Sequence, residues 1–365
     1  MSEQTPLDHI ENVPKKTQRK RLQRGLLALA GLMLLSTPLA GLWMVHDLAG
    51  KVIYYKYGPE RWARQRPGIC SPSRRELVYA DLRPTGLGAD HYRPGLPSRD
   101  KYTALEFSCN QARRLSAASA YAQTQDGLRI HYRIFASDLG ANAPLLLHVP
   151  GITSAWLDGA RYAGAARRMG FRLAVLELRN HGISDNDGFG AGYGCREAKD
   201  VLAVAKALMQ RYPQSQLLIW GSSMGSMSIL NAAAELEQFP KVRALVIENP
   251  PTSLREVVEV SFAPGRPKPL YDAVLAMASF RSQVDYGRCA PISLTPQLQL
   301  PAFVTVAQAD SLTPVSMVEK VYQSLPTGKG HQFKIYPHGD HAAIWNGQPK
   351  TYEADILAFW RGMAL

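Results

Sequence analysis

Hydrophobic patterns typical of strands and of helices alternate from about residue 116 to the end of the chain. The first is a pair of strand-like stretches on either side of Asp126 and Gly127, a turn signal that predicts an antiparallel hairpin. Continuous apolar runs then alternate with amphipathic stretches, which predict helices at about 155–169, 196–211, 224–238 and 315–325. This alternation predicts an α/β fold with a mainly parallel sheet and helices on both faces.

The chain before residue 116 has a different pattern, which divides it into three parts. Residues 1–24 form a basic tail, with six Lys or Arg against three acidic residues. Residues 25–45 contain no charged residue over 21 positions, long enough as a helix to cross a hydrocarbon core of about 30 Å. Residues 46–115 are rich in Arg, Pro and Gly without a sustained period, and we expect a linker or lid there.

The charges around the apolar run predict its orientation. Six Lys or Arg precede it and only Lys51 and Lys56 follow within 15 residues, so the N-terminus should be cytoplasmic and the rest extracytoplasmic. The absence of an Asn-x-Ser/Thr sequon favours a bacterial periplasm. A cleavable signal peptide, cut near Pro38 and Ala40, is the alternative, but 24 residues are long for its basic region. We therefore expect a single-pass anchor.

Composition and charge narrow the function classes. With 365 residues, 46% hydrophobic and 20% charged, the chain can bury a full core. Much of its net charge of +12 lies in residues 1–24 and 51–114, beside the expected membrane surface. Because no basic recognition helix or RNA-binding strand is visible, we expect no nucleic-acid partner. No metal-ligand spacing occurs among the nine His and four Cys, so we predict no metal and no cofactor.

The strongest chemical signal is the sequence Gly221-Ser222-Ser223-Met224-Gly225. It lies where a predicted strand meets a predicted helix, the context of a nucleophile elbow, which exposes the Ser223 hydroxyl on a strained turn. Gly221 and Gly225 are needed because a side chain at either position would collide where strand and helix approach. A surface turn is the alternative in a chain with 29 Gly, and the strand–helix context favours the elbow.

With this elbow, residues 116–365 resemble the α/β-hydrolase superfamily. Asp310 follows a later strand and His341 follows the last one, in the order Ser223, Asp310, His341 that this fold implies for a catalytic triad. The segments IENPPTSLREV and GDHAAIW are also similar to the membrane-anchored, small-capped branch of the superfamily. The sequence leaves His338 open as another base, and Glu248 and Asp340 as other acids.

The roles of the triad follow from the protons that acyl transfer must move. A neutral His341 would take the proton of the Ser223 hydroxyl, while Asp310 would accept the other ring N–H and hold the tautomer. The oxyanion needs N–H donors, and we expect the Met224 amide to be one. The resemblance implies Ile152 as the second, with Thr153 as the alternative.

The segment at about 252–290 is expected to form a small cap with an acyl pocket, or else to close the core. The predicted reaction is hydrolysis of a carboxylic ester or thioester of a small-molecule or lipid-like acyl substrate, through an acyl-enzyme on Ser223. An aminopeptidase or amidase is the first alternative, for which Glu256 and Glu259 are the available acidic residues. A catalytically dead binding module is the second. The oligomeric state stays open, and His181 is expected to be structural.

Four cysteines allow three pairings, and export would let disulfides persist. Cys70 and Cys109 bracket most of the polar linker, which predicts that they pair with each other. The resemblance places Cys195 and Cys289 on loops at the active-site side of the sheet, which predicts the second pair. Four free thiols in a cytoplasm-facing protein are the alternative.

Overall fold

The structure, a computed structural model, describes residues 39–54, 115, 118–152, 154, 156–262 and 264–363. The chain divides into two compact units, residues 1–48 and 49–365. A helix covers residues 39–53, and no helix within the described ranges is long and apolar enough to cross a membrane. Of the predicted anchor, residues 25–45, only the last seven are described, and Cys70 and Cys109 lie outside the described residues.

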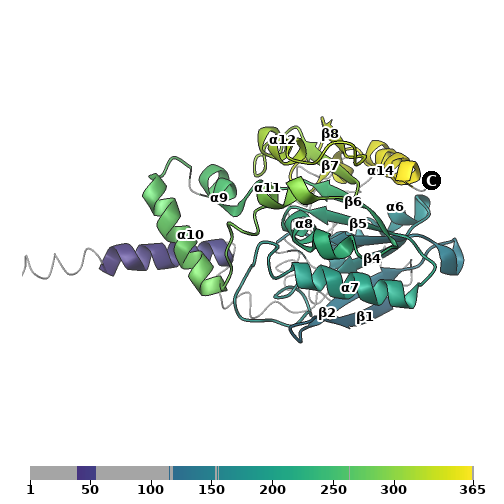
Figure 1. The fold of residues 1–365 in the computed structure, drawn as a ribbon, viewed down its shortest axis with the longest axis horizontal. Coiled ribbons are helices and arrows are strands. Elements are labelled where there is room, and N and C mark those ends of the chain that lie inside the picture. Colours follow the sequence, from purple (N-terminus) through teal and green to yellow (C-terminus); the bar gives the residue numbers. More distant parts are fainter. Residues whose placement is uncertain are drawn as a thin grey trace, which may run out of the picture. The chain divides into compact units, whose positions relative to one another are not determined.

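The second unit is built on one sheet of eight strands in the order β1-β2-β4-β3-β5-β6-β7-β8 (Figure 1). The first hairpin is antiparallel, β2 pairs antiparallel with β4, and the other pairs are parallel. The predicted hairpin and mainly parallel sheet are therefore confirmed. The strands are β1 (Ala118–Gln123), β2 (Arg129–Phe135), β3 (Leu145–Val149), β4 (Arg172–Leu176), β5 (Leu217–Ser222), β6 (Val242–Glu248), β7 (Ala302–Ala307) and β8 (Gln332–Tyr336).

Helices cover both faces of this sheet. The first group, α7 (Ala198–Arg211) and α8 (Met224–Leu236), packs together on one face. Three other helices share a single core cluster with the opposite face, and they are α5 (Trp156–Ala160), α6 (Ala163–Arg168) and α14 (Pro349–Met363). Helix α12 (Val315–Gln323) packs on β7 and β8, the short α13 (Ile344–Gly347) precedes α14, and the 3-10 turn η3 (Gly140–Asn142) precedes β3.

The expected single helix at 155–169 is wrong in one respect, because it is divided into α5 and α6. The interruption falls at Arg161 and Tyr162, whose side chains are both buried. Adjacent residues on one straight helix point about 100° apart, since a turn holds 3.6 residues. Interrupting the helix lets two adjacent large side chains enter the interior.

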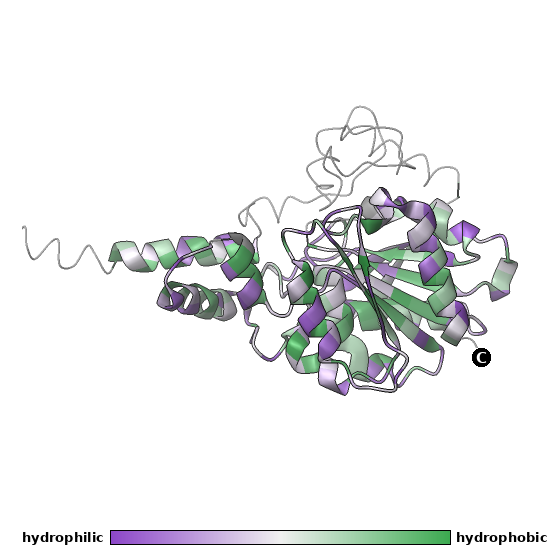
Figure 2. Ribbon diagram, turned by 90° about the horizontal axis from the view of Figure 1, so that it is seen from above, coloured by the Kyte–Doolittle hydropathy of each residue, from purple (hydrophilic) through white to green (hydrophobic). Residues whose placement is uncertain are grey.

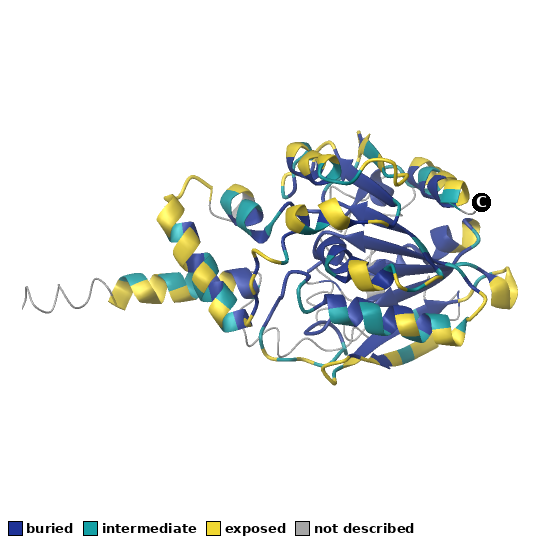
Figure 3. Cartoon of the chain, viewed as in Figure 1, coloured by how far each residue is buried: buried dark blue, intermediate teal, exposed yellow. Residues whose placement is uncertain are grey.

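Burial follows the position of each strand in the sheet. Strands β3, β4, β5 and β7 are buried at every residue, whereas the edge strands β1 and β8 have exposed positions (Figure 3). Figure 2 shows these strands as mainly hydrophobic, while the helices around them carry hydrophilic positions. Continuous apolar runs in the sequence thus correspond to strands covered on both faces.

The insertion between β6 and β7 contains the segment that was predicted as a cap. It consists of α9 (Leu254–Val257), a π-helical turn η4 (Val258–Phe262), α10 (Lys268–Ser282), α11 (Pro291–Leu294) and a 3-10 turn η5 (Thr295–Gln297). The hydroxyl of Ser253 caps α9 by accepting a hydrogen bond from the amide of Glu256. This cap satisfies a backbone amide in the first turn of α9.

Candidate active site

Ser223 lies at the sharp turn between β5 and α8. Its backbone has φ 55° and ψ −119°, a conformation that a residue with a side chain rarely adopts. A Cβ atom on Gly225 would overlap the carbonyl oxygen of Val149, and one on Gly221 would come within 2.6 Å of the Gly225 backbone. The two glycines therefore allow strand, helix and the loop after β3 to meet beneath the serine.

The two neighbouring serines of the motif have different surroundings. The Ser222 hydroxyl is buried and donates a hydrogen bond to Glu248 Oε2 at 2.9 Å. Ser223 instead lines a pocket, while its amide donates to the backbone carbonyl of Glu248 at 2.9 Å. Only the Ser223 hydroxyl of this pair is therefore available to a substrate in the pocket.

His341 and Asp310 are joined by a direct hydrogen bond, from His341 Nδ1 to Asp310 Oδ2 at 2.9 Å. The second oxygen of Asp310 accepts the amides of Leu312 at 2.9 Å and Thr313 at 2.8 Å. The Thr313 hydroxyl donates to Asp310 Oδ2 at 2.8 Å and lies 3.2 Å from His341 Nδ1. Both oxygens of the carboxylate are thus committed to donors, which fixes the orientation of the imidazole.

The other ring nitrogen of His341, Nε2, is buried and has no hydrogen-bond partner among the described residues. Thr313, which contacts the His341 ring, lines the same pocket as Ser223. This arrangement leaves Nε2 as the atom of His341 that can accept a proton from a group in the pocket.

Burial and charge shift the pKa values of His341 and Asp310 in opposite directions. Burial by itself would lower the pKa of His341, but the charge of Asp310 and its hydrogen bond outweigh burial and raise that pKa above the usual value. Burial would likewise raise the pKa of Asp310, but the charge of His341 and the surrounding donors hold it below the usual value. Asp310 is therefore ionised near neutral pH and stabilises a protonated His341.

The other candidates for acid and base have different positions. Asp340 accepts the backbone amide of His341 at 2.7 Å, rather than its ring. Glu248 is fully buried and accepts hydrogen bonds from Trp220 Nε1 and Ser222, and burial raises its pKa. His338 is exposed, and its carbonyl accepts a hydrogen bond from Gln348. Of these groups, only Asp310 bonds the His341 ring.

Two further residues hold the loop of His341, and sequence reasoning did not identify either of them. Asn249, directly after β6, donates its side-chain amide to Asp310 Oδ2 and accepts the amide of Ala342 at 3.3 Å. Arg161, between α5 and α6, donates to the Ala342 carbonyl at 2.7 Å. Ala342, next to His341, has φ 54°, a strained value. The hydrogen bonds from Arg161 and to Asn249 hold the peptide groups on both sides of it. The only earlier signal for Asn249 was its place in the segment IENPPTSLREV.

The pocket beside Ser223 is lined mainly by apolar side chains. Its lining consists of Ile152, Tyr193, Ser223, Met224, Met227, Pro251, Val257, Leu312 and Thr313. The space in it that a water-sized group can occupy is about 20 Å³, roughly one water molecule, within about 350 Å³ of empty space that includes open solvent. Both predicted oxyanion residues, Ile152 and Met224, thus lie at the same pocket as Ser223, whereas Thr153 lies outside the described residues.

His181 is buried in a network of structural hydrogen bonds. Its Nδ1 lies 2.8 Å from the carbonyl oxygen of Arg179, and burial lowers its pKa. Arg179 is itself buried and paired with Asp200 at 2.8 Å and with Asp126 at 2.9 Å. This network joins the loop after β4 to α7 and to the turn of the first hairpin.

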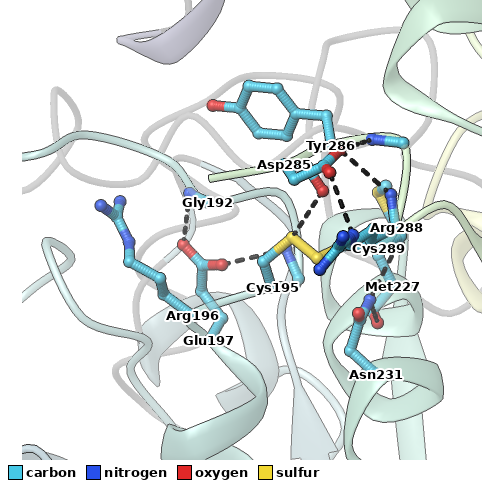
Figure 4. The surroundings of a disulfide bond; sticks show 12 residues. Gly192, Cys195, Arg196, Glu197, Met227, Asn231, Asp285, Tyr286, Arg288 and Cys289 are labelled. Carbon is cyan, nitrogen blue, oxygen red and sulfur yellow. Dashed lines mark hydrogen bonds and ion pairs between the residues drawn. A yellow bond between two sulfur atoms is a disulfide. The ribbon is translucent and has the colours of Figure 1, made fainter. Parts of the chain in front are cut away.

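The predicted disulfide between Cys195 and Cys289 is confirmed, with a Cα–Cα distance of 5.4 Å (Figure 4). It joins the loop just before α7 to the loop between α10 and α11 in the insertion between β6 and β7. Asn231 of α8 donates to the carbonyls of Cys289 at 3.1 Å and of Met227 at 2.8 Å, which links the bridge to the helix of the nucleophile. Within the described ranges, no group of three or more His, Cys, Asp or Glu could hold a metal ion.

Comparison with known proteins agrees with this architecture. The family described as "alpha/beta hydrolase fold" matches residues 144–275. An esterase from Pyrococcus furiosus is similar in structure, with 18% identity, a TM-score of 0.52, and coverage of 69% of this chain and 95% of that one. A membrane phospholipase A described as a bacterial virulence factor has 19% identity, a TM-score of 0.51, and coverage of 71% and 91%.

A third similar structure is Est1E from Butyrivibrio proteoclasticus with bound ferulic acid, at 14% identity and a TM-score of 0.52. It covers 67% of this chain and 98% of its own. No match was found among curated protein sequences. The family match and the similar structures show that the chain has the α/β-hydrolase fold, as the sequence predicted.

Proposed function

We propose that this protein is a serine hydrolase that cleaves a carboxylic ester or thioester through an acyl-enzyme on Ser223. The observation that carries the proposal is the strained backbone of Ser223 at the β5–α8 turn. A plain surface turn does not require a positive φ at a residue with a side chain, whereas a nucleophile elbow does. The family match and the similarity to esterases support hydrolysis as the reaction class.

In the proposed reaction, Ser223 Oγ attacks the carbonyl carbon of the substrate while its proton passes to His341 Nε2. The resulting oxyanion is bound by the amides of Met224 and Ile152. When the intermediate collapses, the bond to the leaving group breaks and His341 returns the proton to that group. Water then repeats the sequence on the acyl-enzyme, which releases the acid and restores Ser223.

The pocket favours an ester or thioester over the peptidase alternative. Its lining offers apolar contacts to an acyl group, and recognition of a free amine would require an unpaired carboxylate. The two acidic residues considered for that role are already paired, Glu256 with Lys320 at 2.8 Å and Glu259 with Arg255 at 3.4 Å. The intact set of Ser223, His341 and Asp310 argues against a catalytically dead binding module.

Activity-based labelling tests the proposal most directly. A fluorophosphonate probe should label the wild-type protein and Ser222→Ala but not Ser223→Ala, because only an activated hydroxyl reacts near neutral pH. Labelling that persists in Ser223→Ala would contradict the assignment. Turnover of acyl esters and thioesters, measured beside aminoacyl amides, separates the two substrate classes, and faster cleavage of the amides would favour the amidase.

We further propose that residues 25–45 anchor the enzyme in a membrane, with residues 1–24 cytoplasmic and the hydrolase domain in the bacterial periplasm. The Cys195–Cys289 disulfide supports an oxidising compartment. Deleting residues 1–45 should move the protein from the membrane fraction to the soluble fraction with ester turnover retained. Full-length protein that is extracted by alkaline carbonate would contradict the anchor.

A further inference from the structure

Residues Ala49–Tyr54 are part of the second unit, although only three residues separate them from the predicted anchor. Val52 and Ile53 are buried, with 3% and 0% of their surfaces exposed. The backbone carbonyl of Ile53 accepts the amide of Ala191 at 2.8 Å, and that of Val52 accepts the hydroxyl of Tyr193 at 2.7 Å. The segment is therefore bonded to the loop that precedes α7.

A glycine in this loop allows the backbone of the segment to approach closely. Gly190 has φ +72°, and a Cβ atom there would come within 2.7 Å of the Ile53 carbonyl oxygen. Its close neighbour Gly188 also has a left-handed φ, +82°, but a Cβ atom there would meet no described atom within 4 Å. The close approach of the two backbones therefore depends on glycine at position 190 and not at position 188.

Several bonds hold the other side of the same loop. Glu197 accepts the amides of Gly192 at 2.7 Å and Gly194 at 2.9 Å, and the disulfide of Cys195 follows (Figure 4). Tyr286 donates its hydroxyl to the Ala191 carbonyl at 3.0 Å. These bonds hold the backbone of the loop in place, and the Tyr193 side chain extends from this loop to the Val52 carbonyl.

Tyr193 connects this contact to the active site, because it lines the pocket of Ser223. It is 5% exposed and has φ 48°, so both its backbone and its ring are tightly constrained. The space that a water-sized group can occupy in the pocket is about 20 Å³, within about 350 Å³ of empty space that includes open solvent, so an acyl chain of several carbons would not be enclosed there. The pocket could enclose a longer chain only if a wall residue moved.

We propose that Tyr193 is a specificity-determining residue and that Ala49–Tyr54 is the positioning element that holds it in place. The hydrogen bond to the Val52 carbonyl keeps the Tyr193 ring in the pocket wall, so the enzyme selects esters of short acyl chains. Loosening this contact opens the wall to longer chains. The inference rests on the proposed function, since it concerns the acyl group that is transferred to Ser223.

The experiment compares variants of the full-length protein on nitrophenyl acetate, butyrate and octanoate. Tyr193→Phe keeps the ring and removes only the hydroxyl, and it should raise the octanoate-to-acetate ratio of kcat/KM by about tenfold or less, a change expected when one hydrogen bond is lost. Gly190→Ala should shift the ratio in the same direction by pushing on Ile53. The matched control, Gly188→Ala, has a similar left-handed φ without that collision and keeps the carbonyl that accepts the Tyr54 hydroxyl at 3.4 Å, so it should leave the ratio unchanged.

Fluorophosphonate labelling of each variant separates this inference from the proposed function. If Ser223 is labelled in the wild type and the chain-length ratio of Tyr193→Phe equals that of the wild type, the role of the segment is refuted. A wild type that prefers octanoate to acetate would also refute it. If Ser223 is not labelled at all, the proposed function itself fails. Should Gly190→Ala fail to fold, Tyr193→Phe still decides the result.

Discussion

Replacing Asp310 by Asn tests the proposed triad, because the groups around Asp310 dictate the orientation of the side-chain amide that is introduced. Oδ1 of Asp310 accepts two backbone amides, those of Leu312 and Thr313, which cannot become acceptors. Oδ2 faces His341 Nδ1, the Thr313 hydroxyl and the Asn249 side chain. The Thr313 hydroxyl can turn to accept a hydrogen bond, and the Asn249 carboxamide can do so if it gives up the Ala342 amide, so the new NH₂ group should take the Oδ2 position.

In that orientation, the side-chain amide introduced by Asp310→Asn would donate to His341 Nδ1. The imidazole would then carry its proton on Nε2, where it cannot accept the proton of the Ser223 hydroxyl. In serine hydrolases with this wrong tautomer, kcat falls by about 10⁴, which corresponds to about 5 kcal/mol in activation free energy. We expect Asp310→Asn to lower ester turnover by about this factor.

The assay is steady-state hydrolysis of a nitrophenyl ester, with thermal denaturation to verify that the variant folds. Asp340→Asn is the matched control, since Asp340 bonds the backbone of His341 and not its ring. We expect that control to stay within a few-fold of the wild type at alkaline pH. An Asp310→Asn enzyme within tenfold of the wild type would refute the reasoning, and a large loss in Asp340→Asn would move the acid to that residue.

Three other predictions concern pH, the elbow and the disulfide. The value of kcat/KM should rise with pH along a limb whose midpoint lies above 6.5, because Asp310 raises the pKa of His341 and only the neutral ring accepts a proton. Asp340→Asn should move this limb to lower pH, since the charge of Asp340 also raises that pKa, and an unmoved limb would contradict the assignment. Gly225→Ala should abolish activity or folding because its Cβ would overlap the Val149 carbonyl, whereas Gly362→Ala, with no described atom within 4 Å, should keep both turnover and stability. Cys195→Ser should lower the free energy of unfolding by about 4.7 kcal/mol, given the 94-residue separation of the bridge, and urea denaturation that is identical to that of the wild type would contradict this estimate.

Local patterns carried most of what could be predicted from the sequence. The elbow at Ser223 was predictable because its glycines, strand and helix are adjacent in the chain, and their steric requirements act over a few residues. The hairpin at Asp126 and Gly127 was predictable for the same reason. Resemblance to a known fold supplied the order of Asp310 and His341 and the pairing of Cys195 with Cys289.

Contacts between distant parts of the chain were decided only by the tertiary structure. Arg161 reaches the carbonyl of Ala342 across 181 positions, and Tyr193 reaches that of Val52 across 141. Neither side chain stands out in the sequence, because a hydrogen bond to a backbone carbonyl requires no particular residue at the accepting position. The choice of Asp310 over Asp340 and Glu248 was likewise open in the sequence, since all three carboxylates follow or end late strands. It was decided by which carboxylate the packing of β6, β7 and β8 brings to the His341 ring.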